Sequence, residues 1–289
     1  MKTFYYVHTG HRIGLDRFRR SAAILKKFQD KEITLLTSDY RIAQVAKEYG
    51  IENCVGIDVV RNIPHIAQNG DQLIFDSDEA NPLMLEDMRR YFSKFIRLSD
   101  NASDQKADNE FLISPYLEGE GICRAVAVDD VFFQKEREKD ITLSYFFGDD
   151  DYEKDLQKHF DFIDGLEPYL QLGFYYFLDY EDMLKEKFKN YFEFEAYEEM
   201  IQRSQILLTA SPQAVLDSLA NGGKPIYFQR EDYPLDFILL FEQLNVPIIK
   251  NYEKNELSVI LKTINNRKYE EIEQNCNKIA KFIKANLNL

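Results

Sequence analysis

The segment from His8 to Arg20 concentrates side chains that could bind an anion or move a proton. It holds four arginines and two of the four histidines of the chain, His8 and His11. Arg17 and Arg20 are three residues apart, so on a helix they share one side. Arginines near a helix N-terminus can bind phosphate or carboxylate bidentately, and a histidine beside them can act as a general base. The segment predicts either an anion site or a solvated helix face whose arginines pair with nearby acids.

Two acidic clusters follow apolar runs. The residues Asp76–Glu79 come directly after one run, where paired carboxyl groups could do acid–base work or cap the next helix. Gly148 precedes three aspartates, and a glycine at such a turn allows the close backbone approach that phosphate loops need. Three aspartates repel a phosphate unless a metal intervenes. We expect Asp149 or Asp150 to cap a helix, and we predict no metal site.

A third pattern combines a well-marked helix with an acid inside it. Ser211 is a favourable N-cap, Pro212 suits the first helical position, and Gly222-Gly223 should end the helix. The small side chain at the start would let a ligand approach the helix N-terminus, where backbone N–H groups attract anions. Asp217, one and a half turns later, could accept hydrogen bonds from ribose hydroxyls. The alternative is simply a capped helix of an α/β domain.

The elements that position these residues alternate between strands and helices. The expected strands are Thr3–Val7, Ile33–Thr37, Val55–Val59, Gln72–Phe75, Lys94–Leu98, Glu110–Ser114, Ile141–Phe147, Gly173–Leu178, Gln205–Thr209 and Ile226–Gln229. The expected helices are Asp16–Gln29, Tyr40–Tyr49, Pro82–Ser93, Asp151–Ile163, Ser211–Gly222 and Tyr269–Asn286. This alternation predicts parallel sheets covered on both faces, and ligands of such sheets bind at the carboxyl ends of the strands.

A charged run, Gln134–Asp140, has no apolar periodicity and predicts a boundary between two domains. We therefore expect an N-terminal domain of residues 1–134 and a C-terminal domain of residues 141–289. A length of 289 residues fits two domains. A hydrophobic content of 45% is enough for two packed cores.

Charge and cysteine content exclude several classes of protein. The chain has 36 basic and 50 acidic residues, a net charge of −14, which disfavours general binding to nucleic acid or to an anionic membrane. No apolar run is long enough for a membrane-spanning helix. Three cysteines without a Cys-x-x-Cys pair disfavour a disulfide framework or a structural zinc site. With no signal pattern at the start, these features predict a cytoplasmic protein.

The third pattern resembles the second domain of GT-B nucleotide-sugar enzymes. Within that fold, the chain is similar to the UDP-sugar hydrolases of pseudaminic acid biosynthesis and their spore-coat glycosyltransferase-like relatives. Ile13–Arg20 resembles that family's I-G-x-G-H-x-x-R, Phe146–Asp151 its G-G-T-D turn, and Ser204–Pro225 its nucleotide-binding segment, with Asp217 where the family has Glu. The resemblance implies two Rossmann-like parallel-sheet domains of GT-B type with a ligand cleft between them.

The chain departs from the family pattern at two positions. The family's Gly-His pair, whose histidine is catalytic, falls on Asp16-Arg17, and the second glycine of G-G-T-D is Asp149. Arg20 matches the family's arginine. An arginine cannot be a general base near neutral pH, so Arg17 would act electrostatically, and His11 or Asp76 would be the base.

Together, these implications predict a nucleotide-sugar enzyme, most directly a UDP-sugar hydrolase or glycosyltransferase of surface or flagellar glycan biosynthesis. The expected catalytic residues are His11, Arg17 and Asp76. The expected substrate-binding residues are Arg20, Gly148, Ser211, Gln213 and Asp217. We expect no cofactor, no metal, no nucleic acid and no membrane insertion, and the oligomeric state is left open. The alternative is a catalytically silent relative that binds a sugar nucleotide or a partner protein, which the loss of the Gly-His pair favours.

Overall fold

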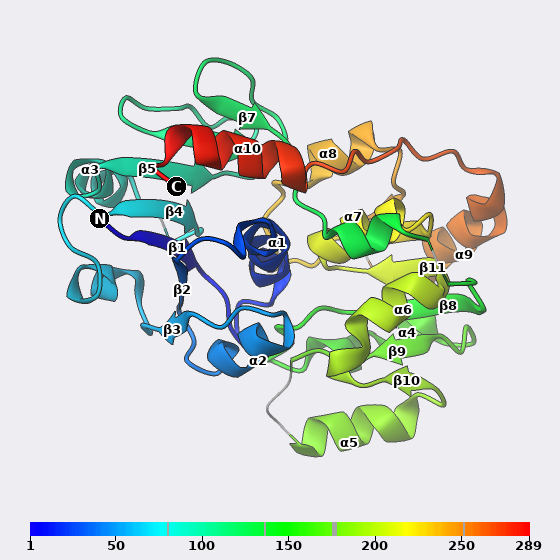
Figure 1. The fold of residues 1–289 in the computed structure, drawn as a ribbon. Coiled ribbons are helices and arrows are strands. Elements are labelled where there is room, and N and C mark those ends of the chain that lie inside the picture. The colour runs from blue at the N-terminus through cyan, green and yellow to red at the C-terminus, as the bar shows by residue number, and fades with distance from the viewer. Residues whose placement is uncertain (80, 136, 175–177, 251) are drawn as a thin grey trace. The chain divides into compact units, whose positions relative to one another are not determined.

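The computed structural model describes residues 1–289 except 80, 136, 175–177 and 251. The chain divides into two compact units, and Figure 1 follows it from the N-terminus to the C-terminus. The first unit comprises Met1–Gly10, Arg17–Asp129 and Gln274–Leu289. The second comprises His11–Asp16 and Asp130–Glu273.

Over its described residues, the first unit contains a seven-stranded parallel sheet in the order β3-β2-β1-β4-β5-β6-β7. Its strands are β1 Thr3–Val7, β2 Ile33–Thr37, β3 Cys54–Gly56, β4 Gln72–Asp76, β5 Lys94–Leu98, β6 Phe111–Ser114 and β7 Ile122–Arg124. Its α-helices are α1 Asp16–Leu25, whose first residue is counted with the second unit, α2 Ile42–Glu48, α3 Pro82–Tyr91 and α10 Cys276–Asn286. The strand order reverses between β1 and β4.

The central strands of the first unit are mainly apolar and fully buried. Every residue of β1 and β4 is buried, as expected for parallel strands that are covered on both faces. On one face, Phe75 and Phe95 pack with Met88 and Phe92, which α3 and its C-cap supply. Helix α3 begins as the sequence predicts, because Asn81 accepts a hydrogen bond from the backbone N–H of Met84 at 3.0 Å.

The closing helix α10 belongs to the first unit, which differs from the expected domain ranges of 1–134 and 141–289. Figure 1 shows it in red beside β5 and β7. Its Cys276 donates to the backbone oxygen of Val128 at 3.1 Å, and the rings of Phe282 and Phe111 lie 6.3 Å apart. The buried side of α10 thus packs on residues that precede the charged run.

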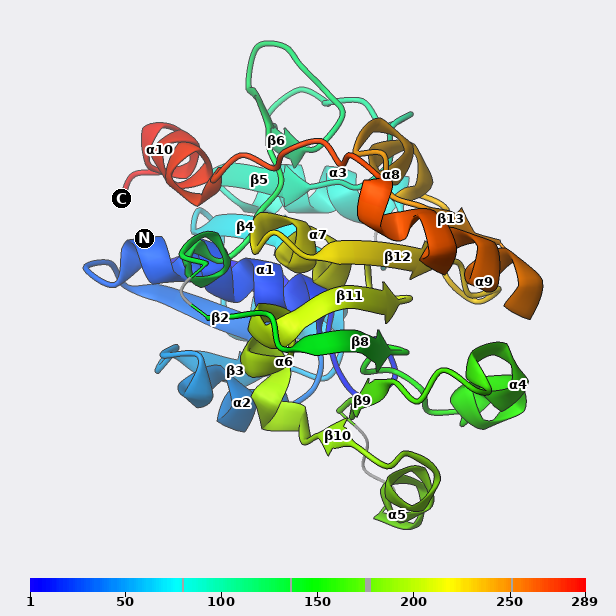
Figure 2. The ribbon, with the colours of Figure 1, turned by 90° about the vertical axis from the view of Figure 1, so that its right-hand side faces the viewer.

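Over its described residues, the second unit contains a six-stranded parallel sheet in the order β10-β9-β8-β11-β12-β13. Figure 2 shows the arrows of β8, β11 and β12 pointing the same way. The strands are β8 Ile141–Phe146, β9 Tyr169–Gln171, β10 Tyr191–Phe192, β11 Ser204–Thr209, β12 Lys224–Phe228 and β13 Ile248–Ile249. The α-helices are α4 Phe160–Ile163, α5 Leu178–Lys187, α6 Tyr197–Arg203, α7 Pro212–Ala220, α8 Ile238–Gln243 and α9 Lys254–Thr263. Here the order reverses between β8 and β11.

Successive side chains of β8 face opposite sides of the second sheet, and helices cover both sides. Tyr145 packs in a cluster with residues of α4, α5 and α9. Phe146 faces the other way, where its ring lies 5.7 Å from that of Tyr197 on α6. On the same side as Phe146, Tyr227 lies 4.8 Å from Phe241 of α8. This two-sided burial is the arrangement that the alternating sequence predicts.

Several expected elements differ from the observed ones for local reasons. The expected strand Gly173–Leu178 falls partly on residues 175–177, which lie outside the described residues. Gly173 is not part of a strand, and Leu178 is the first residue of α5. The strand in this region is β9, which lies just before the expected one. The expected helix Asp151–Ile163 is a 3₁₀ turn, Asp155–His159, followed by α4. The expected helix Tyr269–Asn286 begins only at Cys276, and before it the backbone N–H of Glu270 donates to the backbone oxygen of Leu244 at 3.1 Å.

Among the helices that the structure describes, none is both long and apolar enough to cross a bilayer.

Candidate functional site

Each sheet has one carboxyl edge where the strand order reverses, and this is where open α/β sheets bind ligands. In the first unit, β1 and β4 pair in register with Val7 opposite Asp76. The residues that follow the two strands are therefore neighbours, and the backbone N–H of His8 donates to the backbone oxygen of Asp76 at 2.9 Å. We call this group, with its arginines from α1, the first-unit edge.

His8 is held by two carboxylates at the first-unit edge. Its Nδ1 atom contacts the carboxylate of Asp78, and its Nε2 atom lies 3.9 Å from Oε2 of Glu79. The hydroxyl of Tyr6 donates to Glu79. Burial raises the pKa of Asp78, but the hydrogen bond to His8 and the charge of Arg17 outweigh it and hold that pKa well below its usual range. An ionised carboxylate beside an imidazole is an arrangement suited to proton transfer.

The arginines of α1 point at the same edge. The Nε atom of Arg20 donates to Asp76 at 2.7 Å, and its Nη1 atom donates to both oxygens of Asp100 at 2.7 and 2.9 Å. Arg17 lies 3.1 Å from Asp78 and 3.8 Å from Asp76. Burial lowers the pKa of Arg20, but the charges of Asp100 and Asp76 raise it well above its usual value. The guanidinium of Arg20 thus has two carboxylate partners within the protein.

The structure brings together three of the predicted residues of this region. Arg17, Arg20 and Asp76 meet at the first-unit edge. Asp76 is 0% exposed and paired with Arg20, so its carboxylate is not open to a substrate in this structure. His11 belongs to the second unit, where its ring lies 5.6 Å from that of Tyr152. His8, which sequence reasoning considered but did not select, is the histidine that stands beside the carboxylates.

The second-unit edge lies at the ends of β8 and β11, which pair with Phe146 opposite Thr209. Helix α7 starts here, and the side chain of Ser211 accepts a hydrogen bond from the backbone N–H of Ala214 at 3.0 Å. The predicted N-cap is therefore present. The Ser211 hydroxyl donates to Oδ1 of Asp16 at 2.6 Å, and the backbone N–H of Gln213 lies 3.2 Å from Oδ2 of the same carboxylate.

Asp217 occupies a different environment from the one expected of a ribose-binding acid. It is 1% exposed. Its carboxylate accepts from the hydroxyl of Tyr197 at 2.8 Å and from Nε2 of Gln213 at 2.8 Å. Its partners are thus protein side chains, one on α6 and one on its own helix. The sequence spacing predicts that Ser211, Gln213 and Asp217 lie at the start of or within one helix, as they do. It could not show that the Tyr197 hydroxyl would donate to the Asp217 carboxylate.

The turn after β8 is packed against a buried arginine that sequence reasoning missed. Gly148 has a φ of +129°, and a Cβ atom there would lie 2.8 Å from Oδ1 of Asp150. Arg230 donates to that oxygen at 2.8 Å and to Asp232, and the Tyr233 hydroxyl donates to Asp150 at 2.6 Å. Burial raises the pKa of Asp150 against the opposing charge of Arg230. The sequence feature that could have identified Arg230 is its position directly after the expected strand Ile226–Gln229.

Asp151, and not the predicted Asp149 or Asp150, supplies the side-chain acceptor at the start of the 3₁₀ turn Asp155–His159, whose N-cap position is Lys154. The Oδ1 atom of Asp151 accepts from the backbone N–H of Asp155 at 2.6 Å. In the described part of the chain, no three His, Cys, Asp or Glu side chains are arranged to hold a metal ion.

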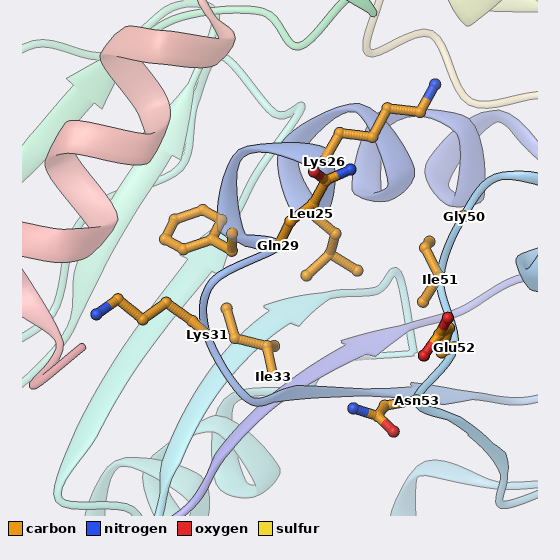
Figure 3. Close-up of a pocket in the computed structure, with 10 residues that line it drawn as sticks. Leu25, Lys26, Gln29, Lys31, Ile33, Gly50, Ile51, Glu52 and Asn53 are labelled. Carbon is orange, nitrogen blue, oxygen red and sulfur yellow. The ribbon is translucent and has the colours of Figure 1, made fainter.

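The first unit has a cavity of about 330 Å³ that is lined by Leu25, Lys26, Phe28, Gln29, Lys31, Ile33, Gly50, Ile51, Glu52 and Asn53. In Figure 3, the side chains of Leu25, Ile33 and Ile51 point toward one another within it, while Lys26 and Lys31 point outward. It opens where β2 begins, at the amino edge of the sheet, and none of the predicted site residues lines it. The cavity and the chemically active side chains therefore lie at different edges of the first sheet. The candidate site is defined by the chemically active side chains.

No protein-family model and no curated protein matches this sequence. Solved structures do match its fold. The UDP-GlcNAc 2-epimerase of Methanocaldococcus jannaschii, determined with UDP-GlcNAc and UDP, is 12% identical, with a TM-score of 0.62 over 99% of this chain and 100% of that one. Anabaena Alr3699/HepE with UDP and glucose is 13% identical, with a TM-score of 0.56 over 99% and 97% of the two chains.

MurG of Acinetobacter baumannii is 9% identical, with a TM-score of 0.55 over 99% of this chain and 100% of that one. At such low identity, these likenesses concern the fold. With the two parallel sheets described above, they show that the chain has the GT-B fold of two Rossmann-like domains.

Proposed function

We propose that the protein is a nucleotide-sugar enzyme that binds a UDP-sugar through its second unit and transfers or hydrolyses the sugar. The observation that carries the proposal is the start of α7, where a capped helix N-terminus stands at the carboxyl edge, beside the point at which the strand order reverses. Two of the similar structures were determined with UDP or a UDP-sugar, which supports this choice of ligand class.

In this proposal, the N-terminus of α7 binds the diphosphate. Ser211 and the backbone N–H of Gln213 are the donors that already hold a carboxylate in this structure. Asp217 acts as a positioning residue, because it accepts a hydrogen bond from the side chain of Gln213. Gly148 keeps the neighbouring turn close to Arg230.

The first unit contains the candidate group for proton transfer. His8 is the general base or acid, because Asp78 is ionised and fixes the imidazole. Arg17, at 3.1 Å from Asp78, stabilises that carboxylate and adds positive charge beside it. Asp76 and Arg20 hold the edge together through their buried ion pair. The family resemblance adds surface or flagellar glycan biosynthesis in the cytoplasm as the setting.

The test is turnover of UDP-GlcNAc and UDP-glucose by the parent and by two variants. His8→Gln removes the proton-transfer group and should lower turnover by about 10²–10⁴-fold. His65→Gln is the matched control, because His65 is an exposed histidine of the same unit, and it should stay within about twofold of the parent. Equal turnover in parent and His8→Gln would remove His8 from the mechanism.

The second candidate function is a catalytically silent protein that binds a sugar nucleotide or a partner protein. It is favoured by the carboxylate of Asp16, which already occupies donors at the start of α7. Calorimetric binding of UDP without turnover of either sugar nucleotide would select this candidate. Absence of both binding and turnover would refute the nucleotide-sugar proposal.

A further inference from the structure

An acidic side chain of the protein itself sits at the N-terminus of α7. Asp16 accepts from the Ser211 hydroxyl at 2.6 Å through Oδ1 and from the backbone N–H of Gln213 at 3.2 Å through Oδ2. The two oxygens of one carboxylate thus face two neighbouring donors, as the oxygens of a bound phosphate would. All of these residues belong to the second unit.

The donors at this helix start are few. Helix α7 has nine residues, and its first residue, Pro212, has no backbone N–H. The N–H of Ala214 is bound by the side-chain oxygen of Ser211 at 3.0 Å. The two donors that Asp16 uses are therefore the ones that an anionic ligand would need at this end of the helix.

The segment that carries Asp16 is attached to the second unit at further points. Arg12 donates to the hydroxyl of Tyr152 at 2.6 Å, and its guanidinium lies 4.0 Å from the centre of that ring. These contacts hold the segment that leads to Asp16, the first residue of α1.

We propose that Asp16 is a resident anion that competes with the diphosphate of the ligand for the N-terminus of α7. The choice of a diphosphate rests on the proposed function, whereas the competition rests on the observed contacts. Two anions cannot share the same two donors, so a phosphate binds there only when the Asp16 carboxylate moves away. Asp16 then sets how tightly the second unit holds an anionic ligand.

The test measures binding of inorganic pyrophosphate, UDP and uridine by calorimetry. Asp16→Ala should strengthen the binding of pyrophosphate and UDP by at least tenfold, which corresponds to about 1.4 kcal/mol. Uridine, which has no phosphate, should bind parent and variant alike. Adding Ser211→Ala to Asp16→Ala should remove most of the gain, because it removes the hydroxyl donor.

Two further variants separate the proposal from general effects. Asp140→Ala removes one negative charge at the amino edge of the same sheet, next to the start of β8, and should leave pyrophosphate binding within twofold of the parent. Asp16→Asn keeps the side-chain size and serves if the alanine variant does not fold; it should also strengthen pyrophosphate binding.

The outcomes distinguish this inference from the proposed function. Unchanged affinity for pyrophosphate and UDP in both Asp16 variants would overturn the competition, even if the parent binds UDP well. An equal gain in Asp140→Ala would also overturn it, because net charge would then explain the effect. Stronger pyrophosphate binding in Asp16→Ala without any binding of UDP would support the competition and refute the choice of UDP.

Discussion

Replacing Arg20 with methionine should strongly destabilise the first unit. Methionine keeps an unbranched, flexible side chain but removes the guanidinium that donates to Asp76 at 2.7 Å and to Asp100 at 2.7 and 2.9 Å. Asp76 is 0% exposed, so its carboxylate cannot regain water without a local opening. The Tyr5 hydroxyl at 3.3 Å and the Nε atom of Arg17 at 3.8 Å are weaker, more distant partners.

The size of the effect follows from burial. Removing one partner of a buried ion pair typically costs about 3–5 kcal/mol, because the other charge is left uncompensated. The matched control is Arg90→Met on α3, where Arg90 and Glu86 form an i,i+4 pair with side chains 72% and 46% exposed. Pairs of that kind contribute about 0.3–0.5 kcal/mol. The two substitutions change the same residue type in the same unit, so their difference reports burial.

The assay is urea unfolding followed by far-ultraviolet circular dichroism, because the chain has no tryptophan. Hydrogen exchange of the β1 and β4 amides assigns the loss of stability to the first unit. Adding Asp76→Asn to Arg20→Met should restore part of the loss, since a neutral amide costs less to bury than an unpaired carboxylate. A loss in Arg20→Met no larger than in Arg90→Met would refute the structural role that we assign to this ion pair.

Two other predictions concern the second unit. Burial lowers the pKa of Lys139 to about 8, so between pH 8 and about 10.4 the unfolded chain keeps a proton that the folded chain has released. The free energy of unfolding of the parent should therefore rise with pH across this window relative to Lys139→Met, as measured by urea unfolding, and parallel pH profiles would contradict the assignment. Gly148→Ala should cost about 1–3 kcal/mol, because its φ is +129° and a Cβ atom would lie 2.8 Å from Asp150. Gly50→Ala should cost less in the same assay, since its φ is +76° with no atom within 4 Å of the added Cβ, and equal losses would show that the contact with Asp150 is unimportant.

Local patterns in the sequence predict most of the elements that carry the site. The strands Thr3–Val7, Ile33–Thr37 and Lys94–Leu98 agree with the structure residue for residue, because apolar runs of this length suit strands that are buried on both faces. The start of α7 is also as expected, since Ser211 and Pro212 act through contacts within a few residues.

The surface on which α10 packs could not be predicted in the same way. The apolar positions of this helix, Ile279 and Ile283, show that one side is buried, but any apolar surface would satisfy that pattern. The partner is fixed by residues far away in the sequence, such as Val128 and Phe111. A charged run near residue 137 marked a boundary, but it could not show that the end of the chain belongs to the first unit.

Residue type and spacing predicted that Asp76 stands at the end of a strand and that Ser211 begins a helix, and the structure agrees with both placements. The functional roles given to the site residues remain predictions. Whether each polar side chain faces a ligand or a protein partner depends on contacts that no local pattern encodes. Asp217 is one such case, because Tyr197, 20 residues earlier, donates to its carboxylate.

At both edges, carboxylates of this acidic chain already occupy the positively charged and N–H groups that an anionic ligand would use. At the first-unit edge, Arg20 is held by Asp76 and Asp100. At the second-unit edge, Arg230 is held by Asp150 and Asp232, and the start of α7 is held by Asp16. Under the proposed function, an anionic ligand gains only the difference between its own interaction and that of a carboxylate already in place. A diphosphate has more charge and more acceptor oxygens than a carboxylate, so the proposal expects tighter binding of a diphosphate than of a ligand with a single carboxylate, and it ties that affinity to the stability of the contacts that the ligand displaces.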